Sequence, residues 1–313
     1  MMINSSPIHH ILFPENWPAY TLLDSGHGRK LEAFGPYRFI RPEAQALWAP
    51  FLDDSEWSHV DGIFASDRSD DNDEASDGRG RWQLSPALPE SWEMSYEDLR
   101  FVAHPTPFRH LGFFPEQSPH WLWTADQIKA FRSRHQRAPR LLNLFAYSGL
   151  ASLHAAQAGA EVTHLDASKK AVAQAFENRD LSALSDAPIR FITDDASRFV
   201  EREIRRGRHY DGIMLDPPKY GRGPKGEVWR LEEHLPDLLA GCRALLSDTP
   251  LLFIATIYAI RTSTSAVQSA VGDALAGMGG ILQAGELAIR EEREAGRAIG
   301  QALYVRWSGH ETS

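Results

Sequence analysis

Residues 141–152 constrain the fold more strongly than any other stretch. They read Leu-Leu-Asn-Leu-Phe-Ala-Tyr-Ser-Gly-Leu-Ala-Ser, which is a short apolar run followed by a turn with one glycine. The residues after that glycine, 150–157, have the apolar spacing of a helix. A strand, a tight turn and a helix in this order are typical of the first unit of a ligand-binding α/β sheet. We therefore predict that this turn faces a ligand.

Acidic residues stand at the ends of later strand-like runs. Asp166 closes the run 162–166, and Asp216 closes the run 210–216. Ligands of an open α/β sheet lie beyond the carboxyl ends of its strands, and an acid at the tip of the second strand can accept hydrogen bonds from a ribose. We expect Gly149, Asp166, Asp195 and Asp216 to share one rim that binds a nucleoside.

The turn itself indicates which nucleoside. A dinucleotide site needs several glycines so that the backbone can approach a pyrophosphate, whereas residues 145–149 contain one glycine and bulky neighbours. S-Adenosylmethionine has no phosphate, so it is the predicted cofactor. Asp166 is assigned to the ribose and Asp195 to the adenine amino group, with Asp194 as the neighbouring candidate or the cap of the next helix. The cofactor-binding residues predicted on the rim are Phe145, Ala146, Tyr147, Ser148, Gly149, Asp166, Ala167, Asp194, Asp195 and Ala196.

Five motifs in this order carry a family resemblance. They are Asn-Leu-Phe-Ala-Tyr-Ser-Gly at 143–149, Asp-Ala-Ser-Lys-Lys-Ala-Val at 166–172, Asn178, Thr-Asp-Asp-Ala at 193–196 and Asp-Pro-Pro-Lys-Tyr at 216–220. The chain resembles the class I S-adenosylmethionine-dependent methyltransferases. It is most similar to the bacterial large-subunit rRNA methyltransferases with Asn-Leu-Phe-x-Tyr-Thr-Gly and Asp-Pro-Pro-x-Phe motifs. The resemblance covers about the last 200 residues and implies methyl transfer to ribosomal RNA.

The alternation of elements predicts a Rossmann-like α/β fold with a parallel sheet. Two final strand-like runs around residues 294–297 predict a terminal hairpin with one antiparallel strand, which is typical of class I methyltransferases. A lead-in helix over 123–136, capped by Thr124, precedes the sheet. The predicted strands are 140–145, 161–165, 189–193, 211–215, 250–256, 281–290 and 302–307, and the helices are 150–158, 168–181, 196–205, 228–246 and 264–277.

Residues 1–120 predict a smaller β-rich domain before a methyltransferase domain at 121–313. Glycine and proline break its alternating runs, as in hairpins. Two interpretations stay open for its mixed basic and aromatic positions: an RNA-contacting face, or an exposed strand face over an aromatic core. These positions are Arg29, Lys30, Phe34, Tyr37, Arg38, Phe39 and Arg41. The acidic stretch 66–80 predicts a mobile loop or hairpin tip.

Residues 112–117, Gly-Phe-Phe-Pro-Glu-Gln, resemble a segment that closes over the cofactor in related methyltransferases. The resemblance implies that Gln117 hydrogen-bonds the methionyl end of the cofactor. A plain domain-joining turn is the alternative interpretation.

The Asp-Pro-Pro-Lys-Tyr motif predicts a substrate site. Paired prolines stiffen the chain and leave outward carbonyls that can accept from a base amine. Asp216 is placed to orient or deprotonate that amine, and Tyr220 to stack on the base. The predicted catalytic residues are Asp216, Pro217, Pro218 and Tyr220. The predicted substrate-binding residues are Lys219, Arg222 and Lys225, with Arg230 as a further phosphate contact.

The cysteine content bears on the reaction type. Enzymes of this group that methylate C5 of cytosine use a thiolate near the end of the fifth strand, where this chain has Thr256. The only cysteine, Cys242, falls on the apolar face of a predicted helix. We therefore predict transfer to a base nitrogen.

Composition limits the remaining options. A formal net charge of −9 argues against a surface that is basic throughout, so any RNA contact is local. No signal sequence, membrane span or metal-ligand spacing is evident, which predicts a cytoplasmic enzyme without a metal. A small-molecule or protein substrate, or a cofactor-binding module without catalysis, are the alternatives. The oligomeric state stays open.

Overall fold

The computed structural model describes residues 4–5, 9–66, 80–258 and 262–309. The chain divides into two compact units. The large unit comprises residues 1–12, 119–287 and 302–313, and the small unit comprises 13–118 and 288–301. The division into domains at residues 120 and 121 stays a prediction. In the structure, residues 1–12 group with the large unit, and residues 288–301, at the tip of the last hairpin, group with the small unit. The acidic stretch at 67–79 lies outside the described residues.

A mixed sheet forms the centre of the large unit. Its strand order is β1-β17-β18-β16-β13-β10-β11-β12, and β2 also pairs with β17. The pairs among β12, β11, β10, β13 and β16 are parallel, and β18 joins β16 antiparallel. The strands are β1 (Asn4–Ser5), β2 (His10–Leu12), β10 (Arg140–Leu144), β11 (Glu161–Asp166), β12 (Ile189–Thr193), β13 (Gly212–Leu215), β16 (Leu252–Tyr258), β17 (Ile281–Arg290) and β18 (Ala298–Ser308).

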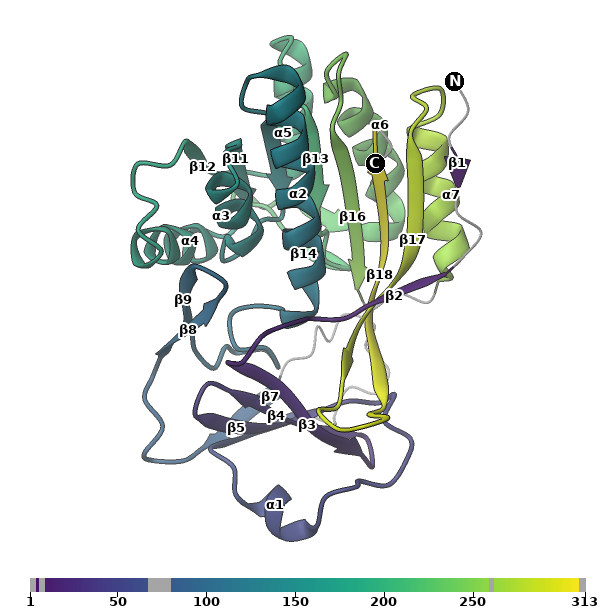
Figure 1. Cartoon of the computed structure of the whole chain (residues 1–313). Coiled ribbons are helices and arrows are strands. Elements are labelled where there is room, and N and C mark those ends of the chain that lie inside the picture. Colours follow the sequence, from purple (N-terminus) through teal and green to yellow (C-terminus); the bar gives the residue numbers. More distant parts are fainter. Residues whose placement is uncertain (1–3, 6–8, 67–79, 259–261, 310–313) are drawn as a thin grey trace. The chain divides into compact units, whose positions relative to one another are not determined.

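Helices cover both faces of this sheet because its strands alternate two sets of apolar side chains (Figure 1). On β10, Leu142 and Leu144 pack with α5, α6 and α7, whereas Leu141 packs with α2 and α3. The helices are α2 (Ser118–His135), α3 (Leu150–Gln157), α4 (Lys169–Leu181), α5 (Ala196–Arg205), α6 (Leu231–Leu245) and α7 (Thr264–Ala274).

The predicted fold class is confirmed, including the terminal antiparallel strand. Three details differ. The lead-in helix begins at Ser118, so Thr124 is not a cap; it is buried inside α2, and its hydroxyl lies 3.9 Å from Met214 Sδ. The predicted helix at 228–246 begins only at Leu231. Strands β1 and β2, drawn in purple in Figure 1, join the sheet beside β17, although no sequence pattern predicted this pairing.

The small unit is built from short strands around an aromatic core. Its five-stranded sheet has the order β3-β4-β5-β6-β7, and β8 and β9 form a separate hairpin. Phe34, Phe39, Trp92 and Phe113 contact one another in its interior. The elements are β3 (Tyr20–Gly26), β4 (Arg29–Phe34), β5 (Tyr37–Pro42), α1 (Asp54–Ser58), β6 (Gly62–Ser66), β7 (Gly80–Leu84), β8 (Trp92–Tyr96), β9 (Leu99–Ala103) and the 3₁₀ helix η2 (Pro115–Gln117).

Two of the basic residues in this unit are structural. Arg41 donates to both carboxylate oxygens of buried Glu32, each at 2.6 Å. Lys30 lies 3.4 Å from Glu43 and donates to Gln301 at 2.8 Å. Burial alone would raise the pKa of Glu32, but Arg41 and Lys30 outweigh it and lower that pKa. Lys30 and Arg41 are therefore not part of an RNA-contacting face, which leaves Arg29 exposed and Arg38 half-buried.

A buried carboxylate holds the start of the large sheet. Asp211, just before β13, accepts two hydrogen bonds from Arg137, at 2.6 and 2.8 Å, and one each from the Arg140 amide and the Ser247 hydroxyl at 2.8 Å. Burial alone would raise the pKa of Asp211, but these hydrogen bonds outweigh it and lower the pKa. The ionised carboxylate therefore stabilises the folded state above about pH 4, and this contribution is lost as the pH falls through the lowered pKa.

We expect Asp211→Ala to lower the free energy of unfolding at pH 7 by roughly 2 to 3 kcal/mol, because charged hydrogen bonds are lost. Asp237→Ala, at an exposed position of α6, is the matched control and should change it by less than about 0.5 kcal/mol. Urea denaturation at several pH values measures both. The Asp211 difference should shrink below about pH 4; a difference that stays constant there would contradict this role.

Candidate functional site

The register of the parallel strands brings the predicted site residues to one rim. Leu144 pairs with Leu165 and with Leu215, and Asp166 pairs with Thr193. These pairs stand at the carboxyl ends of β10, β11, β12 and β13. The turn after β10, the acid that ends β11, the pair Asp194–Asp195 and Asp216 therefore follow neighbouring strand ends, where ligands of open α/β sheets bind.

The turn at 145–149 has an unusual backbone. Phe145, Tyr147 and Gly149 have positive φ angles of 57°, 47° and 89°. Left-handed backbone is unfavourable for residues with a Cβ, so two aromatic residues held there mark stored strain. A Cβ on Gly149 would also meet Cβ of Ala175 at 2.8 Å. The single glycine is thus required both by its φ and by the close approach of α4.

Hydrogen bonds hold this strained turn in place. The Tyr147 amide donates to Asp166 Oδ2 at 2.9 Å, and the Ala146 amide donates to the Leu165 carbonyl at 3.0 Å. From α4, the buried Asn178 amide side chain donates to the Ser148 carbonyl at 2.8 Å. The turn is therefore fixed to the end of β11 and to α4 before any ligand binds.

A buried polar group below the turn was not identified as a site from the sequence. Asn143 Nδ2 donates to Ser152 Oγ at 2.9 Å, and Ser152 Oγ lies 3.0 Å from His164 Nδ1. All three side chains are buried, and burial lowers the pKa of His164 to about 3, so the imidazole is neutral. The sequence did contain a feature that could have identified this group. Asn143 is a polar residue within the apolar strand β10, on the face that α3 covers. The group ties β10, α3 and β11 together beneath the turn.

Asp166 is the acceptor that the ribose prediction requires. Its two oxygens accept from the backbone amides of Tyr147 and Ser168, at 2.9 and 2.8 Å. Burial raises the pKa of Asp166 above its usual value, against the lowering effect of these two amides. No basic side chain forms an ion pair with it among the residues that the structure describes. A carboxylate without a countercharge suits the hydroxyls of a ribose or a cationic ligand and opposes a phosphate.

The roles of the two acids after β12 need a correction. Asp195, not Asp194, caps α5: its Oδ1 accepts from the Arg198 amide at 3.0 Å. Asp194 instead accepts from the Asp195 amide at 2.9 Å and pairs with Arg202 at 2.6 Å. The ion pair commits Asp194 to α5, and the cap occupies one oxygen of Asp195. The contact of Asp195 with the adenine stays a prediction for its second oxygen.

The Asp-Pro-Pro segment leads into a hairpin that the sequence did not predict. Strand β14 (Tyr220–Arg222) pairs antiparallel with β15 (Val228–Arg230), where the sequence had indicated a glycine-rich loop and the start of a helix. Buried Trp229 donates from its indole to the Pro218 carbonyl at 2.7 Å, and the Leu231 amide donates to the Lys219 carbonyl at 3.0 Å. Each of these two carbonyls therefore already accepts one hydrogen bond, and the expectation that carbonyls of this turn accept from a base amine stays a prediction.

The hairpin contacts the turn at 145–149 and helix α5. Trp229 contacts Phe145, with ring centroids 5.1 Å apart. Glu227 pairs with Arg198 at 2.5 Å and accepts from the Lys225 amide at 2.8 Å. Asp216, Lys219 and Tyr220 are half-buried, Pro217 is buried and Pro218 is exposed, while Arg222, Lys225 and Arg230 are exposed. The hairpin thus presents basic side chains to solvent beside the rim.

The predicted position of Cys242 on the apolar face of a helix is confirmed. Cys242 is fully buried on α6, and burial raises the pKa of its thiol to about 12. Thr256 occupies the buried interior of β16. Cys242 therefore supplies no thiolate to the rim.

Gln117 lies outside the large unit, in η2 of the small unit. Its hydrogen bond to the cofactor stays a prediction. No group of three or more side chains that suits a metal ion occurs in the described part of the chain. No helix within that part is both long and apolar enough to cross a membrane.

Comparison with known proteins adds three relatives. A family model described as conserved hypothetical protein 95 matches residues 125–232. A SAM-dependent methyltransferase from Agrobacterium tumefaciens, known from a crystal structure, is 44% identical to this chain in sequence and has a TM-score of 0.91. The match covers 99% of this chain and 96% of the Agrobacterium chain. A putative ribosomal RNA large subunit methyltransferase from Methanocaldococcus jannaschii is 35% identical over 36% of this chain and 28% of its own length. Ribosomal RNA large subunit methyltransferase I from Aeromonas salmonicida is 31% identical over 39% of this chain and 28% of its own length.

The two kinds of relative differ in how much they cover. The Agrobacterium protein is matched along almost its whole length. The ribosomal RNA enzymes are matched over little more than a quarter of theirs. The region that the family model matches carries the rim described above, because residues 125–232 run from α2 through β15.

Gly149→Ala should weaken S-adenosylmethionine binding by about tenfold or more, since left-handed backbone costs an alanine about 1 to 2 kcal/mol and Ala175 leaves no room for a Cβ. Gly277→Ala is the matched control, because Gly277 has a φ of 84° and nothing within 4 Å of the added Cβ. Isothermal titration measures both affinities. Equal losses in the two variants would show that the turn has no special role.

Asp166→Ala should weaken cofactor binding by about 1 to 3 kcal/mol, because charged hydrogen bonds to the ligand and to the Tyr147 amide are lost. Asp186→Ala, at an exposed position before β12, is the control. Equilibrium dialysis with labelled cofactor compares them. An affinity of the Asp166 variant equal to that of the control would remove the ribose assignment.

Proposed function

The chain belongs to the S-adenosylmethionine-dependent methyltransferases, and we propose that it methylates a base of ribosomal RNA at a nitrogen atom. The observation that carries the proposal is the position of the Asp-Pro-Pro-Lys-Tyr segment. It follows β13 on the rim that holds the cofactor turn and leads directly into a hairpin with exposed basic side chains. Named ribosomal RNA large subunit methyltransferases are 31% to 35% identical to parts of this chain.

The rim fits S-adenosylmethionine and not a phosphorylated nucleotide. Its turn has one glycine, and Asp166 accepts only backbone hydrogen bonds among the described contacts. A ribose diol would donate to Asp166, and the adenine amino group to Asp195. When bound, the cofactor supplies an electrophilic methyl group on a sulfonium, whose positive charge is favoured beside these carboxylates.

Asp216 and Tyr220 are the proposed catalytic residues. Methyl transfer to an amine is an in-line displacement, so the protein contributes mainly by positioning the amine and accepting its proton. The Asp216 carboxylate follows β13 directly, with its own amide 3.4 Å from the Leu144 carbonyl. Tyr220, half-buried at the start of β14, offers a ring for stacking on the base. Pro217 and Pro218 fix the chain between them.

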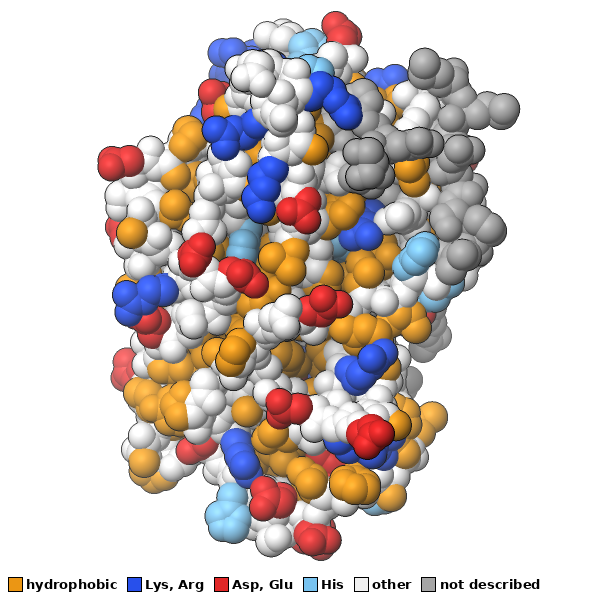
Figure 2. All heavy atoms as spheres, in the orientation of Figure 1, with side chains coloured by type: hydrophobic (Ala, Val, Ile, Leu, Met, Phe, Trp, Pro, Cys, Tyr) orange, Lys and Arg blue, Asp and Glu red, His pale blue; other side chains and the backbone are white. Residues whose placement is uncertain are grey.

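RNA phosphates would bind the exposed hairpin. Lys219, Arg222, Lys225 and Arg230 all lie on or beside β14 and β15. Elsewhere the surface is mixed: on the face shown in Figure 2, acidic and basic side chains are interspersed with apolar ones. With a net charge of −9, the protein would contact RNA through local basic clusters and not through a general positive field.

Transfer to nitrogen is proposed because the chain has no reactive thiol. The route to C5 of cytosine requires a thiolate that attacks the ring. Cys242 is buried in the hydrophobic core, on α6, and burial raises the pKa of its thiol to about 12. An amine nucleophile needs no covalent intermediate, which agrees with a rim of carboxylates.

The small unit is proposed to take part in substrate recognition, through Arg29 and Arg38 and not through the buried Lys30 and Arg41. Gln117 is proposed to contact the methionyl end of the cofactor. Action on ribosomal RNA would place the enzyme in the cytoplasm. The acidic net charge favours a second candidate, a methyltransferase of a small molecule or protein.

Labelled S-adenosylmethionine should transfer its methyl group to deproteinised ribosomal RNA, and nucleoside analysis should find the label on a base nitrogen. Asp216→Asn should reduce kcat by about 10²- to 10⁴-fold and leave cofactor affinity unchanged, as expected when a general base is lost. Asp248→Asn, at a loop position remote from the rim in sequence, is the control.

Three other outcomes have distinct meanings. Label as 5-methylcytosine would contradict the nitrogen assignment. Label only in a parallel small-molecule or protein extract would replace ribosomal RNA by the second candidate. An unchanged kcat in Asp216→Asn would remove Asp216 from the chemistry.

A further inference from the structure

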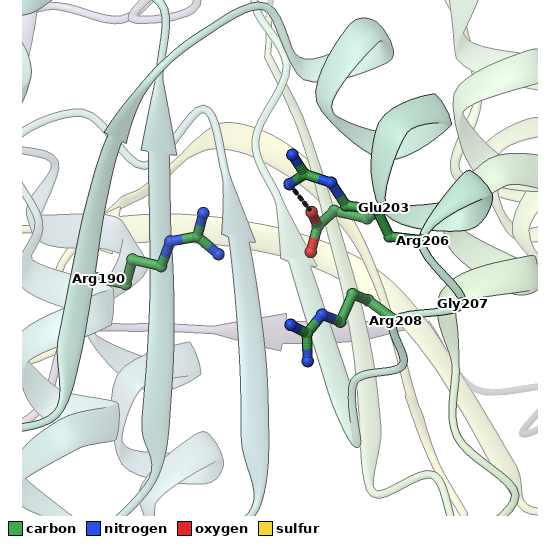
Figure 3. Close-up of a pocket in the computed structure, with 5 residues that line it drawn as sticks. All are labelled: Arg190, Glu203, Arg206, Gly207 and Arg208. Carbon is green, nitrogen blue, oxygen red and sulfur yellow. Dashed lines mark hydrogen bonds and ion pairs between the residues drawn. The ribbon is translucent and has the colours of Figure 1, made fainter.

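A hollow of about 610 Å³ lies at the other edge of the large sheet, away from the cofactor rim. It is lined by Arg190, Glu203, Arg206, Gly207 and Arg208 (Figure 3). Arg190 is the second residue of β12, and the other four come from the end of α5 and the loop that leads toward β13. These positions are at the amino ends of the strands, whereas the cofactor turn, Asp166 and Asp216 follow their carboxyl ends.

The charge of the hollow is positive. Glu203 is the only acidic residue among the described residues that line the hollow, and both of its carboxylate oxygens have partners. Oε1 pairs with Arg206 at 3.2 Å, and Oε2 accepts a hydrogen bond from the Tyr210 hydroxyl at 2.9 Å. Neither Arg190 nor Arg208 forms an ion pair with an acidic side chain in the described parts of the chain. Both are exposed, and in Figure 3 their guanidinium groups extend toward each other across the hollow. Two uncompensated guanidinium groups facing one space favour an anion there.

The backbone around the arginines is ordered by a helix-ending motif. The Gly207 amide donates to the Ile204 carbonyl at 2.9 Å, and the Arg208 amide donates to the Glu203 carbonyl at 3.0 Å. Gly207 has a φ of 61°, so this is a Schellman ending with glycine at the left-handed position. The motif turns the chain back, so that Arg208 lies beside the last turn of α5 and lines the hollow together with Glu203 and Arg206. The basic lining is thus positioned by the fold, although the negative end of the α5 dipole opposes an anion.

The lining also indicates the chemistry of the ligand. Among the described residues, no aromatic or apolar side chain lines the hollow, so the lining offers no aromatic ring to a nucleobase and no apolar surface to a lipid tail. Guanidinium groups match the paired oxygens of a phosphate. The hollow is open to solvent, since three of its five lining residues are exposed arginines. An open, purely polar site suits a phosphate that belongs to a longer chain.

We propose that this hollow binds a backbone phosphodiester of the RNA substrate, as a second anchoring point distinct from the cofactor rim. The proposal rests on the proposed function for the identity of the RNA. Arg190 and Arg208 hold the phosphate oxygens, and Glu203 positions Arg206 beside them. Such a contact fixes the orientation of a large RNA on the protein without reading its bases.

The test compares a double variant with a control of equal charge change. Arg190→Gln with Arg208→Gln removes the two unpaired guanidinium groups. Arg134→Gln with Arg243→Gln removes two arginines from α2 and α6, which also lack ion pairs among the described residues. KM and kcat for ribosomal RNA, KM for the cofactor and the salt dependence of RNA binding are measured for both variants and the wild type.

We expect the Arg190/Arg208 variant to raise KM for RNA about fivefold or more at low salt. The slope of log affinity against log salt should become shallower by roughly 1 to 2, as for the loss of two phosphate contacts. The kcat at saturating RNA and the KM for the cofactor should stay unchanged. The control variant should show less than half of these RNA effects.

The failures of the two proposals are distinguishable. If the wild type methylates ribosomal RNA but both variants behave alike, the phosphate site is wrong and the proposed function stands. If the wild type transfers no methyl group to RNA, the proposed function fails, and equal RNA binding by both variants would overturn the site as well. Titration with inorganic phosphate gives the last arm: saturation at submillimolar phosphate with RNA binding equal in all proteins would replace the RNA contact by a small-anion site.

Discussion

The cofactor rim depends on how a strained turn is held at the end of β10. Phe145 and Tyr147 adopt left-handed backbone, which costs on the order of 1 to 3 kcal/mol per residue. The Tyr147 amide bonded to Asp166 and the Ser148 carbonyl bonded to Asn178 offset this cost, because charged and buried hydrogen bonds each contribute about 1 to 3 kcal/mol. Asp166 therefore shapes the turn, and it is also the residue that we propose as the acceptor for the cofactor ribose.

The turn at 145–149 and the hollow at the end of α5 lie at opposite ends of the strands and differ in local charge. Acidic side chains follow the carboxyl ends of the strands, where Asp166 has no basic partner among the described contacts. Arginines gather at the amino ends, around the close of α5. The rim with Asp166 suits the sulfonium of the cofactor, and the arginine-lined hollow suits a phosphate. The two ends of the parallel strands thus offer opposite electrostatic environments to the cofactor and to the proposed RNA substrate.

Local patterns were sufficient for the core and insufficient for its connections. Strand β12 and helix α5 have the predicted bounds, because the residue pattern of each short element is sufficient to locate it. The hairpin β14–β15 was missed because its stability comes from Trp229 bonding to Pro218 and from Glu227 pairing with Arg198, which are contacts between segments. The capping role predicted for Asp194 failed for the same reason, since Arg202, eight residues further along the chain on α5, pairs with Asp194. Buried Lys30 and Arg41 could not be told from exposed ones, because their partner Glu32 belongs to the same alternating run.

We propose that the carboxyl rim of the large sheet binds S-adenosylmethionine through the turn at 145–149. Amide hydrogen exchange, measured residue by residue with and without saturating S-adenosylhomocysteine, is the decisive measurement. We expect slower exchange at residues 145–149, 166–168 and 194–196, and no change at 206–208, near the amino ends of the strands. Protection at 206–208, or tight binding that leaves the turn at 145–149 unprotected, would contradict it.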